Sequence, residues 1–382
     1  MKLLHTSDWH LGKMIYGRSL LPDQEHFIDN VFLPAVLRER PDCVLLSGDI
    51  YDRPVAPAKA IRLFDRVLVT LSEEMKIPIA IITGNHDGAD RVALAAPLLK
   101  NKGVYLAAKL EDAFSPVTLE KDGERVTLTL LPYFEPEAAR VYFGAPELRG
   151  FAGAYRAVLD AVREKRNPLE TNILLAHCFV TGCKTSDSEN PLYLGGSGEV
   201  PADLFEGFDY VALGHLHAPQ KAGGAARYSG SPLKYSFDEA NQQKGMTLIN
   251  IEGKCVTCKQ IDVPPLRDMR VMTGAFEELM TKGNEQPSDD YLFAELKDKA
   301  PVYMPVEQLR KHYKNLLGLS SDWMKAGGLD ASASPRQNAY HKSTDETVFE
   351  QFMAQICRLE VNESDKNIFT EALKSVNRGD ES

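Results

Sequence analysis

The sequence lacks the features of a membrane-spanning or exported chain. No run of about 18 consecutive apolar residues, the length that a bilayer-spanning helix needs, occurs anywhere in it. The N-terminus reaches Asp8 before an apolar stretch of signal-peptide length can form. The six cysteines are scattered over 382 residues, unlike the dense pattern of a small disulfide-stabilised protein. These absences predict a cytoplasmic protein with free thiols.

A basic excess is also missing. The chain carries 44 Lys and Arg against 54 Asp and Glu, which gives a formal net charge of −10 at pH 7. Proteins that coat nucleic acid are strongly basic, so the composition disfavours a general coating role. A local basic groove or a bound divalent cation provides positive charge even where the average is acidic. DNA binding at one local site therefore stays open.

From residue 2 to about residue 263, apolar runs alternate with stretches of helical spacing. The predicted strands are 2–8, 42–49, 77–83, 126–131, 172–177, 210–214, 227–229 and 246–252, and the predicted helices are 23–40, 58–75, 91–100 and 152–166. The early alternation favours a parallel sheet, and the late run of strands favours a second, more antiparallel sheet. We therefore expect an α/β fold with two packed sheets flanked by helices.

The sequence changes in character after Pro264-Pro265. A strand near 269–272, a helix near 275–282, a strand near 291–296 and a helix near 306–317 predict a small βαβα unit. The small residues GGLDASAS at 327–334 predict a flexible linker, and 345–359 and 364–376 predict two amphipathic helices. The expected organisation is a main domain at 1–264, a small domain at 265–326, a linker at 327–344 and a helical tail at 345–382.

Five polar clusters share one position, the C-terminal end of a predicted strand, where sites assemble in α/β sheets. The clusters are Asp8-Trp9-His10, Gly48-Asp49-Ile50-Tyr51-Asp52, Gly84-Asn85-His86-Asp87, His177, and Gly214-His215-Leu216-His217. Any one of them alone is compatible with a turn or a buried, hydrogen-bonded histidine. Together they offer carboxylate and amide oxygens and imidazole nitrogens without a thiolate. This donor set indicates an open hydrolytic site for Mn²⁺, Fe²⁺ or Zn²⁺.

The ordered series D-x-H, G-D-x-x-D, G-N-H-D, a later H and G-H-x-H resembles the calcineurin-like metallophosphoesterase superfamily. Longer segments, HTSDWHLGK at 5–13, TGCKTSDSE at 181–189, FDYVALGHLHAPQ at 208–220 and YSGSPLKYSFDE at 228–239, resemble its SbcD family of nuclease subunits. The resemblance covers essentially residues 1–263. It implies a β-sandwich flanked by helices, with an α+β capping domain at 265–326 and an SbcC-binding helical tail at 345–382.

The same resemblance implies a site and an activity. Asp8, His10, Asp49 and His217 would surround one divalent metal ion, and Asp49 would bridge to a second one held by Asn85, His177 and His215. The implied protein is a Mn²⁺-dependent DNA nuclease with 3′-to-5′ exonuclease activity on double strands and endonuclease activity on single strands and hairpins. It would act in DNA repair, recombination and replication as a homodimer within a heterotetramer with SbcC, an SMC-like ATPase.

Three residues near these ligands have other expected roles. His86 follows the ligand Asn85 but is assigned to neither metal, so we expect it to protonate the leaving oxygen or stabilise the transition state; the alternative is that it only orients a ligand. Asp52 and Asp87 are expected to orient ligands or cap helices. Two other functions are weighed: a small-nucleotide phosphodiesterase of the same superfamily, and a non-catalytic scaffold that binds DNA or SbcC.

Other features favour ordinary structural roles. Trp9 is more typical of a packed indole than of one that stacks on a base. Cys255 and Cys258 have the spacing of a redox or zinc motif, but no second pair lies nearby. The loop at 182–199 is predicted either to cover the metals or to be solvated.

Overall fold

The computed structural model describes residues 1–189, 198–322, 365–366 and 368–369. Its described residues divide into two compact units, one within 1–271 and 289–291 and the other within 272–288 and from 292 onward. The predicted linker at 327–344 lies outside the described residues, as does the predicted tail at 345–382 apart from residues 365–366 and 368–369. Within the described part, no helix combines the length and apolar character needed to span a bilayer.

The first unit contains two six-stranded sheets, of which the first has the order β16-β15-β1-β4-β5-β6. Its strands are β1 (Lys2–Thr6), β4 (Cys43–Ser47), β5 (Ile79–Ile82), β6 (Val104–Ala107), β15 (Gly245–Glu252) and β16 (Cys255–Asp262). The pairs from β1 through β6 are parallel, whereas β15 lies antiparallel to both β1 and β16. The predicted parallel arrangement of the early strands is confirmed.

The second sheet has the order β13-β14-β12-β9-β8-β7. Its strands are β7 (Val117–Lys121), β8 (Glu124–Leu131), β9 (Thr171–His177), β12 (Tyr210–Gly214), β13 (Gln220–Lys221) and β14 (Ala226–Tyr228). The expectation of a more antiparallel sheet was wrong, because β8, β9, β12 and β14 are parallel and only the two edge pairs are antiparallel. Long connections between β8, β9 and β12 permit the parallel crossovers that a short hairpin forbids. The strand predicted at 246–252 joins the first sheet, as β15.

The helices of this unit are more interrupted than the sequence pattern predicts. They are α1 (Leu21–His26), α2 (Leu33–Glu39), α3 (Ala58–Val69), α4 (Ala89–Val92), α5 (Ala96–Leu99), α6 (Pro136–Phe143) and α7 (Gly150–Lys165). π-Helical turns at Phe27–Phe32 and Thr70–Glu74 continue α1 into α2 and extend α3. The helix predicted at 91–100 is split, because Ala95 adopts a left-handed conformation with φ of 63°. Short strands β2 (Met14–Ile15), β3 (Arg18–Ser19), β10 (Phe179–Val180) and β11 (Glu199–Val200) complete the unit.

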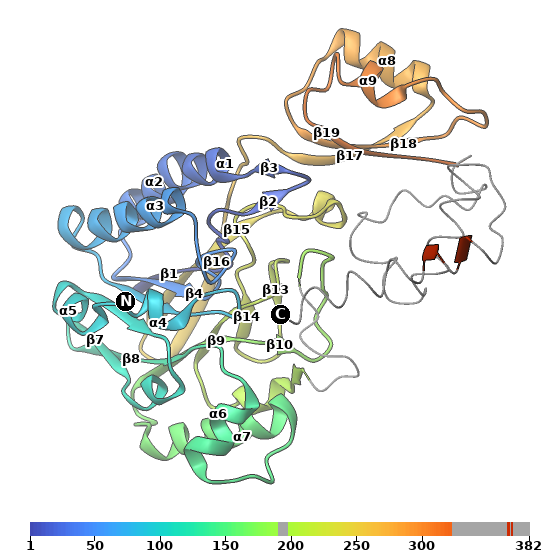
Figure 1. The fold of residues 1–382 in the computed structure, drawn as a ribbon. Coiled ribbons are helices and arrows are strands. Elements are labelled where there is room, and N and C mark those ends of the chain that lie inside the picture. The colour runs from blue at the N-terminus through green and yellow to red at the C-terminus, as the bar shows by residue number, and fades with distance from the viewer. Residues whose placement is uncertain (190–197, 323–364, 367, 370–382) are drawn as a thin grey trace. The chain divides into compact units, whose positions relative to one another are not determined.

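The two sheets pack face to face, with helices on both outer faces (Figure 1). Leu3, Leu45, Leu128 and Leu175 are among the buried residues between the sheets. Helices α1 to α3 cover the first sheet and α6 and α7 cover the second (Figure 1). Trp9 is fully buried in the α1–α3 layer, with its ring edge-on to three phenylalanines, so the packing role predicted for it is confirmed. The predicted β-sandwich flanked by helices is therefore present.

The second unit holds most of a three-stranded sheet of order β17-β18-β19, in which residues 269–271 of β17 and Tyr291 of β18 are counted with the first unit. Its elements are β17 (Met269–Gly274), α8 (Phe276–Glu285), β18 (Tyr291–Leu296), α9 (Pro305–Leu309) and β19 (Leu316–Ser321). The helix predicted at 306–317 was wrong in its second half, because α9 ends at Leu309 and β19 pairs in parallel with β18. Pairing with β18 supplies the backbone hydrogen bonds of β19 and buries Leu316 in the core of this unit.

Candidate metal centre

Five strands of the two sheets end at one place in the first unit, and each delivers polar side chains there. Asp8 and His10 follow β1, Asp49 follows β4, Asn85 follows β5, His177 ends β9, and His215 and His217 follow β12. Six of these seven residues are buried, and the seventh, Asn85, is half-buried. The structure therefore brings together every residue that the sequence proposed as a metal ligand.

The backbone is strained where these side chains converge. The φ values of Asp8, His10, Asp49 and His215 are 55°, 44°, 49° and 109°. Residues other than glycine rarely adopt positive φ values. Such conformations persist only where the surrounding structure imposes them, and they concentrate at functional sites. Asp8 and His10, two residues apart at strained positions, both contribute donor atoms to one cluster, while Trp9 between them packs in the core.

Three glycines that precede these residues are required by crowding. A Cβ on Gly48 would lie 2.3 Å from Nδ1 of His177, and a Cβ on Gly214 would lie 1.8 Å from the carbonyl oxygen of Ser47. A Cβ on Gly84 would lie 2.2 Å from Oδ1 of Asp49. Only glycine allows this close approach of the backbone at the three positions, and at Gly48 the approach is combined with a φ of 87°.

One cluster of donor atoms comes from Asp8, His10 and His217, whose ligand atoms all lie within 4.8 Å of one another. The Nε2 atoms of His10 and His217 are 3.2 Å apart. Oδ2 of Asp8 is buried and makes no hydrogen bond within the described residues, whereas its Oδ1 accepts the backbone N–H of His215 at 2.9 Å. An unpaired carboxylate oxygen beside two imidazole nitrogens is costly unless a cation joins them.

A second cluster is formed by Asp8, Asp49 and His177 within the same 4.8 Å limit. Oδ2 of Asp49 lies 3.4 Å from Nε2 of His177 and 3.5 Å from Nε2 of His10, so this oxygen faces both clusters. Oδ1 of Asn85 lies 3.0 Å from Nε2 of His177 and 3.2 Å from Nδ1 of His215. One carboxylate oxygen of Asp49 therefore lies near imidazole nitrogens of both clusters.

Burial favours the neutral imidazole at His10, His215 and His217, but His177 is an exception. Burial lowers the pKa of His10 well below its usual value, lowers that of His215 to about 3, and also lowers that of His217. Burial opposes charge on His177 too, but the Asp49 carboxylate raises its pKa to about 9. Burial raises the pKa of Asp8 to about 8. Divalent metal ions bind neutral imidazoles and ionised carboxylates, so His10, His215 and His217 already have the ligand form, whereas an ion would displace a proton from His177 and from Asp8.

His86, which follows Asn85, makes contacts with the loop after β4 and lies beside His10. His86 is half-buried; its Nδ1 lies 3.0 Å from the carbonyl oxygen of Asp52, and its backbone N–H donates to Asp49 Oδ1 at 2.9 Å. Its ring lies 4.8 Å from that of His10. Because a carbonyl only accepts, Nδ1 of His86 donates there. His86 also forms a third group of donor atoms with His10 and Asp49, all within 4.8 Å of one another.

Asp87 and Asp52 hold protein groups. Asp87 accepts the backbone N–H groups of Ile50, Tyr51 and Gly84, at 2.9 to 3.1 Å, so it ties the loop after β4 to the loop after β5. Asp52 accepts Lys13 Nζ at 2.8 Å and lies 3.7 Å from Nδ1 of His10. These contacts are those of residues that orient the ligand-bearing loops.

The sequence analysis did not predict the residues that contact the Nδ1 atom and the backbone of His217. Ser188 Oγ lies 2.6 Å from its Nδ1, Glu189 accepts its backbone N–H at 2.6 Å, and Lys244 donates to its carbonyl oxygen at 2.8 Å. Glu239, which is fully buried, pairs with Lys244 at 2.6 Å. Ser188, Glu189 and Glu239 lie in segments that carry the family resemblance, which was the available signal. Cys255 and Cys258 are exposed free thiols on β16.

Comparison with known proteins agrees with this geometry. Residues 1–219 match the family model described as calcineurin-like phosphoesterase, and residues 265–356 match the SbcD_C model, described as type 5 capsule protein repressor C-terminal domain. A curated protein of Staphylococcus epidermidis, named as the SbcD subunit of the nuclease SbcCD, is 32% identical over 355 residues, which is 92% of each chain. The chain belongs to the SbcD family of calcineurin-like phosphoesterases.

Two solved structures also align with the chain. A hypothetical protein from Thermus thermophilus is 15% identical, with a TM-score of 0.37, and the match covers 69% of this chain and 100% of the other. A dimetal phosphatase from Danio rerio is 13% identical, with a TM-score of 0.39, and the match covers 69% and 99%. Membership of the SbcD family confirms the fold and the metal-dependent phosphoesterase class that the sequence predicts.

Proposed function

We propose that this chain is the nuclease subunit of an SbcCD-type complex and hydrolyses phosphodiester bonds of DNA with two divalent metal ions, Mn²⁺ by preference. The observation that carries the proposal is the position of Asp49, whose Oδ2 faces His10 on one side and His177 on the other. Two ions in such a site polarise the phosphodiester and neutralise the negative charge that develops as water attacks.

The ligand sets proposed here are those that the family resemblance implies, and the grouping of Asp8 with His10 and His217 supports the first of them. Asp8, His10, Asp49 and His217 are proposed to hold one ion. The second ion is assigned to Asp49, Asn85, His177 and His215. Support comes from the unpaired buried oxygen of Asp8 and from the neutral state that burial imposes on His10, His215 and His217.

His86 is proposed to act on the substrate. Its ring is fixed by the Nδ1 contact to the Asp52 carbonyl, and its half-buried position leaves Nε2 accessible. In the imidazolium form, in which Nδ1 still donates to the Asp52 carbonyl, Nε2 carries a second proton and donates it to the leaving oxygen, or donates a hydrogen bond to the phosphoryl group. Asp52 and Asp87 serve this arrangement by holding the loops on which His10, Asp49 and His86 lie.

The finer properties are proposals that the resemblance supports. These are 3′-to-5′ exonuclease activity, endonuclease activity on single strands and hairpins, and a homodimer within a heterotetramer with an SMC-like ATPase. The curated relative's name describes that protein as one subunit of a nuclease, SbcCD. The domain organisation of 1–264, 265–326, 327–344 and 345–382 is proposed on the same basis.

Metal content and cleavage of two variants test the proposal. Asp49→Ala removes the shared carboxylate, so it should lose Mn²⁺ from both positions and abolish cleavage of hairpin DNA. His86→Ala should keep the wild-type metal content and lose activity by about 10²- to 10⁴-fold, the usual contribution of a general acid. Asp160→Ala removes an exposed carboxylate on α7 and serves as the control for both.

Each contrary result has a distinct meaning. A His86→Ala protein that binds markedly less Mn²⁺ than wild type would make His86 a ligand. A wild-type protein that hydrolyses a small aryl phosphodiester but not hairpin DNA would indicate a small-nucleotide phosphodiesterase instead. Binding of DNA without metal-dependent hydrolysis of either substrate would indicate a scaffold.

A further inference from the structure

His217 is held on the side opposite His10 by a chain of polar side chains. Its Nδ1 lies 2.6 Å from Oγ of Ser188, and that hydroxyl also hydrogen-bonds to Oε1 of Glu239. The other carboxylate oxygen of Glu239 accepts Nζ of Lys244 at 2.6 Å. Lys244 in turn donates to the backbone carbonyl of His217 at 2.8 Å, which closes a ring of contacts around this residue.

The direction of these hydrogen bonds follows from donor chemistry. Glu239 is paired with the Lys244 ammonium, so it is a carboxylate and only accepts. The hydroxyl proton of Ser188 is therefore donated to Glu239, and its oxygen must accept the proton of His217 Nδ1. With the proton on Nδ1, Nε2 of His217 keeps its lone pair. That is the atom that lies 3.2 Å from Nε2 of His10 in the first cluster.

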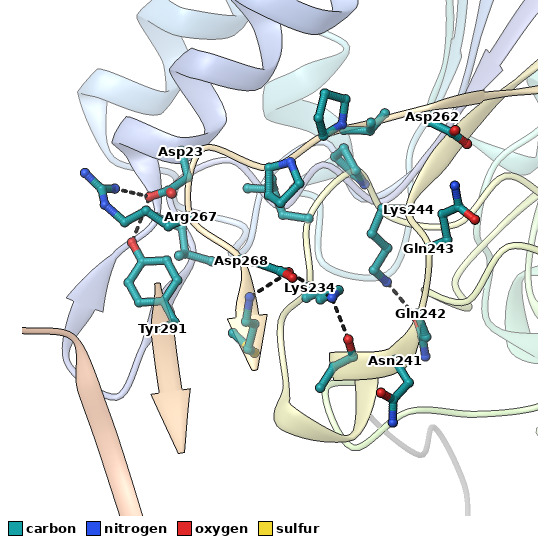
Figure 2. Close-up of a pocket in the computed structure, with 18 residues that line it drawn as sticks. Asp23, Lys234, Asn241, Gln242, Gln243, Lys244, Asp262, Arg267, Asp268 and Tyr291 are labelled. Carbon is teal, nitrogen blue, oxygen red and sulfur yellow. Dashed lines mark hydrogen bonds and ion pairs between the residues drawn. The ribbon is translucent and has the colours of Figure 1, made fainter. Parts of the chain in front are cut away.

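All the hydrogen-bond donors of Lys244 are used in contacts with neighbouring protein groups. Its side chain lies in the wall of a pocket of about 400 Å³, next to Gln242 (Figure 2). Its ammonium faces four acceptors, which are the His217 carbonyl, Ser231 Oγ, Glu239 Oε2 and Gln242 Oε1, all within 3.0 Å. An ammonium has three protons, so no proton is left for a ligand in the pocket. The contacts of Lys244 are thus those of a residue that holds other groups in place.

We propose that Ser188, Glu239 and Lys244 form a positioning relay that fixes the tautomer of His217 and aims its Nε2 at the metal centre. The relay deepens the proposed function and rests on it, since it treats His217 as a metal ligand. Partners that orient a ligating histidine commonly change metal affinity by 10- to 100-fold when removed. None of the three contacts the phosphodiester in this proposal; they act through His217.

The tautomer is measured first, in metal-free protein, by ¹⁵N NMR of histidine-labelled chains with His217→Gln used to assign the signal. Wild type should show the proton on Nδ1. Ser188→Ala should lose this preference, and Ser188→Thr, which restores a hydroxyl, should recover it. Glu239→Gln should reverse it, because the new amide donates to Ser188 and the hydroxyl then donates to Nδ1 of His217.

Mn²⁺ affinity, measured by titration calorimetry, is the second readout. Ser188→Ala should bind one Mn²⁺ about 10- to 100-fold more weakly than wild type, and Ser188→Thr should bind it normally. Ser236→Ala is the matched control, because Ser236 donates to the same oxygen of Glu239 at 2.9 Å but makes no recorded contact with His217. It should match wild type in both measurements.

Two results would overturn the relay: a proton on Nε2 of His217 in the wild type, or a Ser188→Ala protein unchanged in both tautomer and Mn²⁺ affinity. Failure of the proposed function is recognised separately. A wild-type protein that binds no Mn²⁺ or cleaves no DNA contradicts the nuclease assignment, while the NMR measurement, made without metal, still tests the relay.

Discussion

Replacing Gly84 with alanine should damage the metal centre while leaving the protein folded. The added Cβ would lie 2.2 Å from Oδ1 of Asp49, 2.5 Å from its backbone nitrogen and 2.7 Å from Cε1 of His177. Rotation of the Asp49 side chain relieves only the first contact, so the backbone nitrogen of Asp49, now 2.5 Å from the added Cβ, must move away by about 0.9 Å to reach the 3.4 Å of ordinary van der Waals contact.

The expected cost follows from that displacement. Overpacking of this kind typically lowers the free energy of unfolding by about 1–3 kcal/mol, which is less than the roughly 5–15 kcal/mol stability of an ordinary domain. The effect on chemistry is larger, because a displacement of about 1 Å in a catalytic group costs on the order of 100-fold in rate. We therefore expect Gly84→Ala to fold, to bind Mn²⁺ at least about 10-fold more weakly and to lose most cleavage.

The same substitution at Gly153 is the control. Gly153 lies within α7, and the nearest atom to an added Cβ is 3.9 Å away, so alanine should raise stability by about 0.5–1 kcal/mol and leave Mn²⁺ binding unchanged. Urea unfolding followed by circular dichroism in EDTA measures the first quantity, and calorimetric titration with Mn²⁺ measures the second. Wild-type Mn²⁺ affinity in Gly84→Ala would refute the argument from crowding.

Three further predictions concern other parts of the chain. Burial lowers the pKa of His5 to about 3, so on acidification the unfolded chain binds a proton that the folded chain refuses, and this residue alone should cost about 2 kcal/mol of stability between pH 7 and pH 5. Urea titrations of His5→Gln should lose that much less than wild type over this interval, and equal losses would contradict the assigned cause. Affinity for DNA, measured by fluorescence anisotropy, should fall steeply with salt and fall again in EDTA; indifference to both would point to a different partner. Truncation after Ser334 should leave thermal stability and Mn²⁺-dependent cleavage of single-stranded DNA nearly unchanged, while co-purification with SbcC is lost. Aggregation of the truncated chain would instead indicate that the tail packs on the core of the nuclease domain of the same chain.

The sequence alone determined the outline of the candidate site. The sequence gives the donor residue types directly. The end of each apolar run then predicts that its donors lie at the end of a strand, as Asp49 does after β4 and His177 does at the end of β9. Local periodicity was likewise enough for the strands around the site, because each strand is a short apolar run that is buried as a whole.

Only the tertiary structure decided which distant residues meet. Pairing of β15 with β1, the parallel direction of β9 and β12, and the strand at Leu316–Ser321 depend on partners that lie far away in the chain, so local periodicity does not specify them. The contacts of Ser188 with His217 and with Glu239 span 29 and 51 residues. A hydrogen bond across such a distance exists only after the sheets have packed, because packing sets which side chains share a buried space. The sequence therefore specified the donors, and the fold selected the groups that orient them.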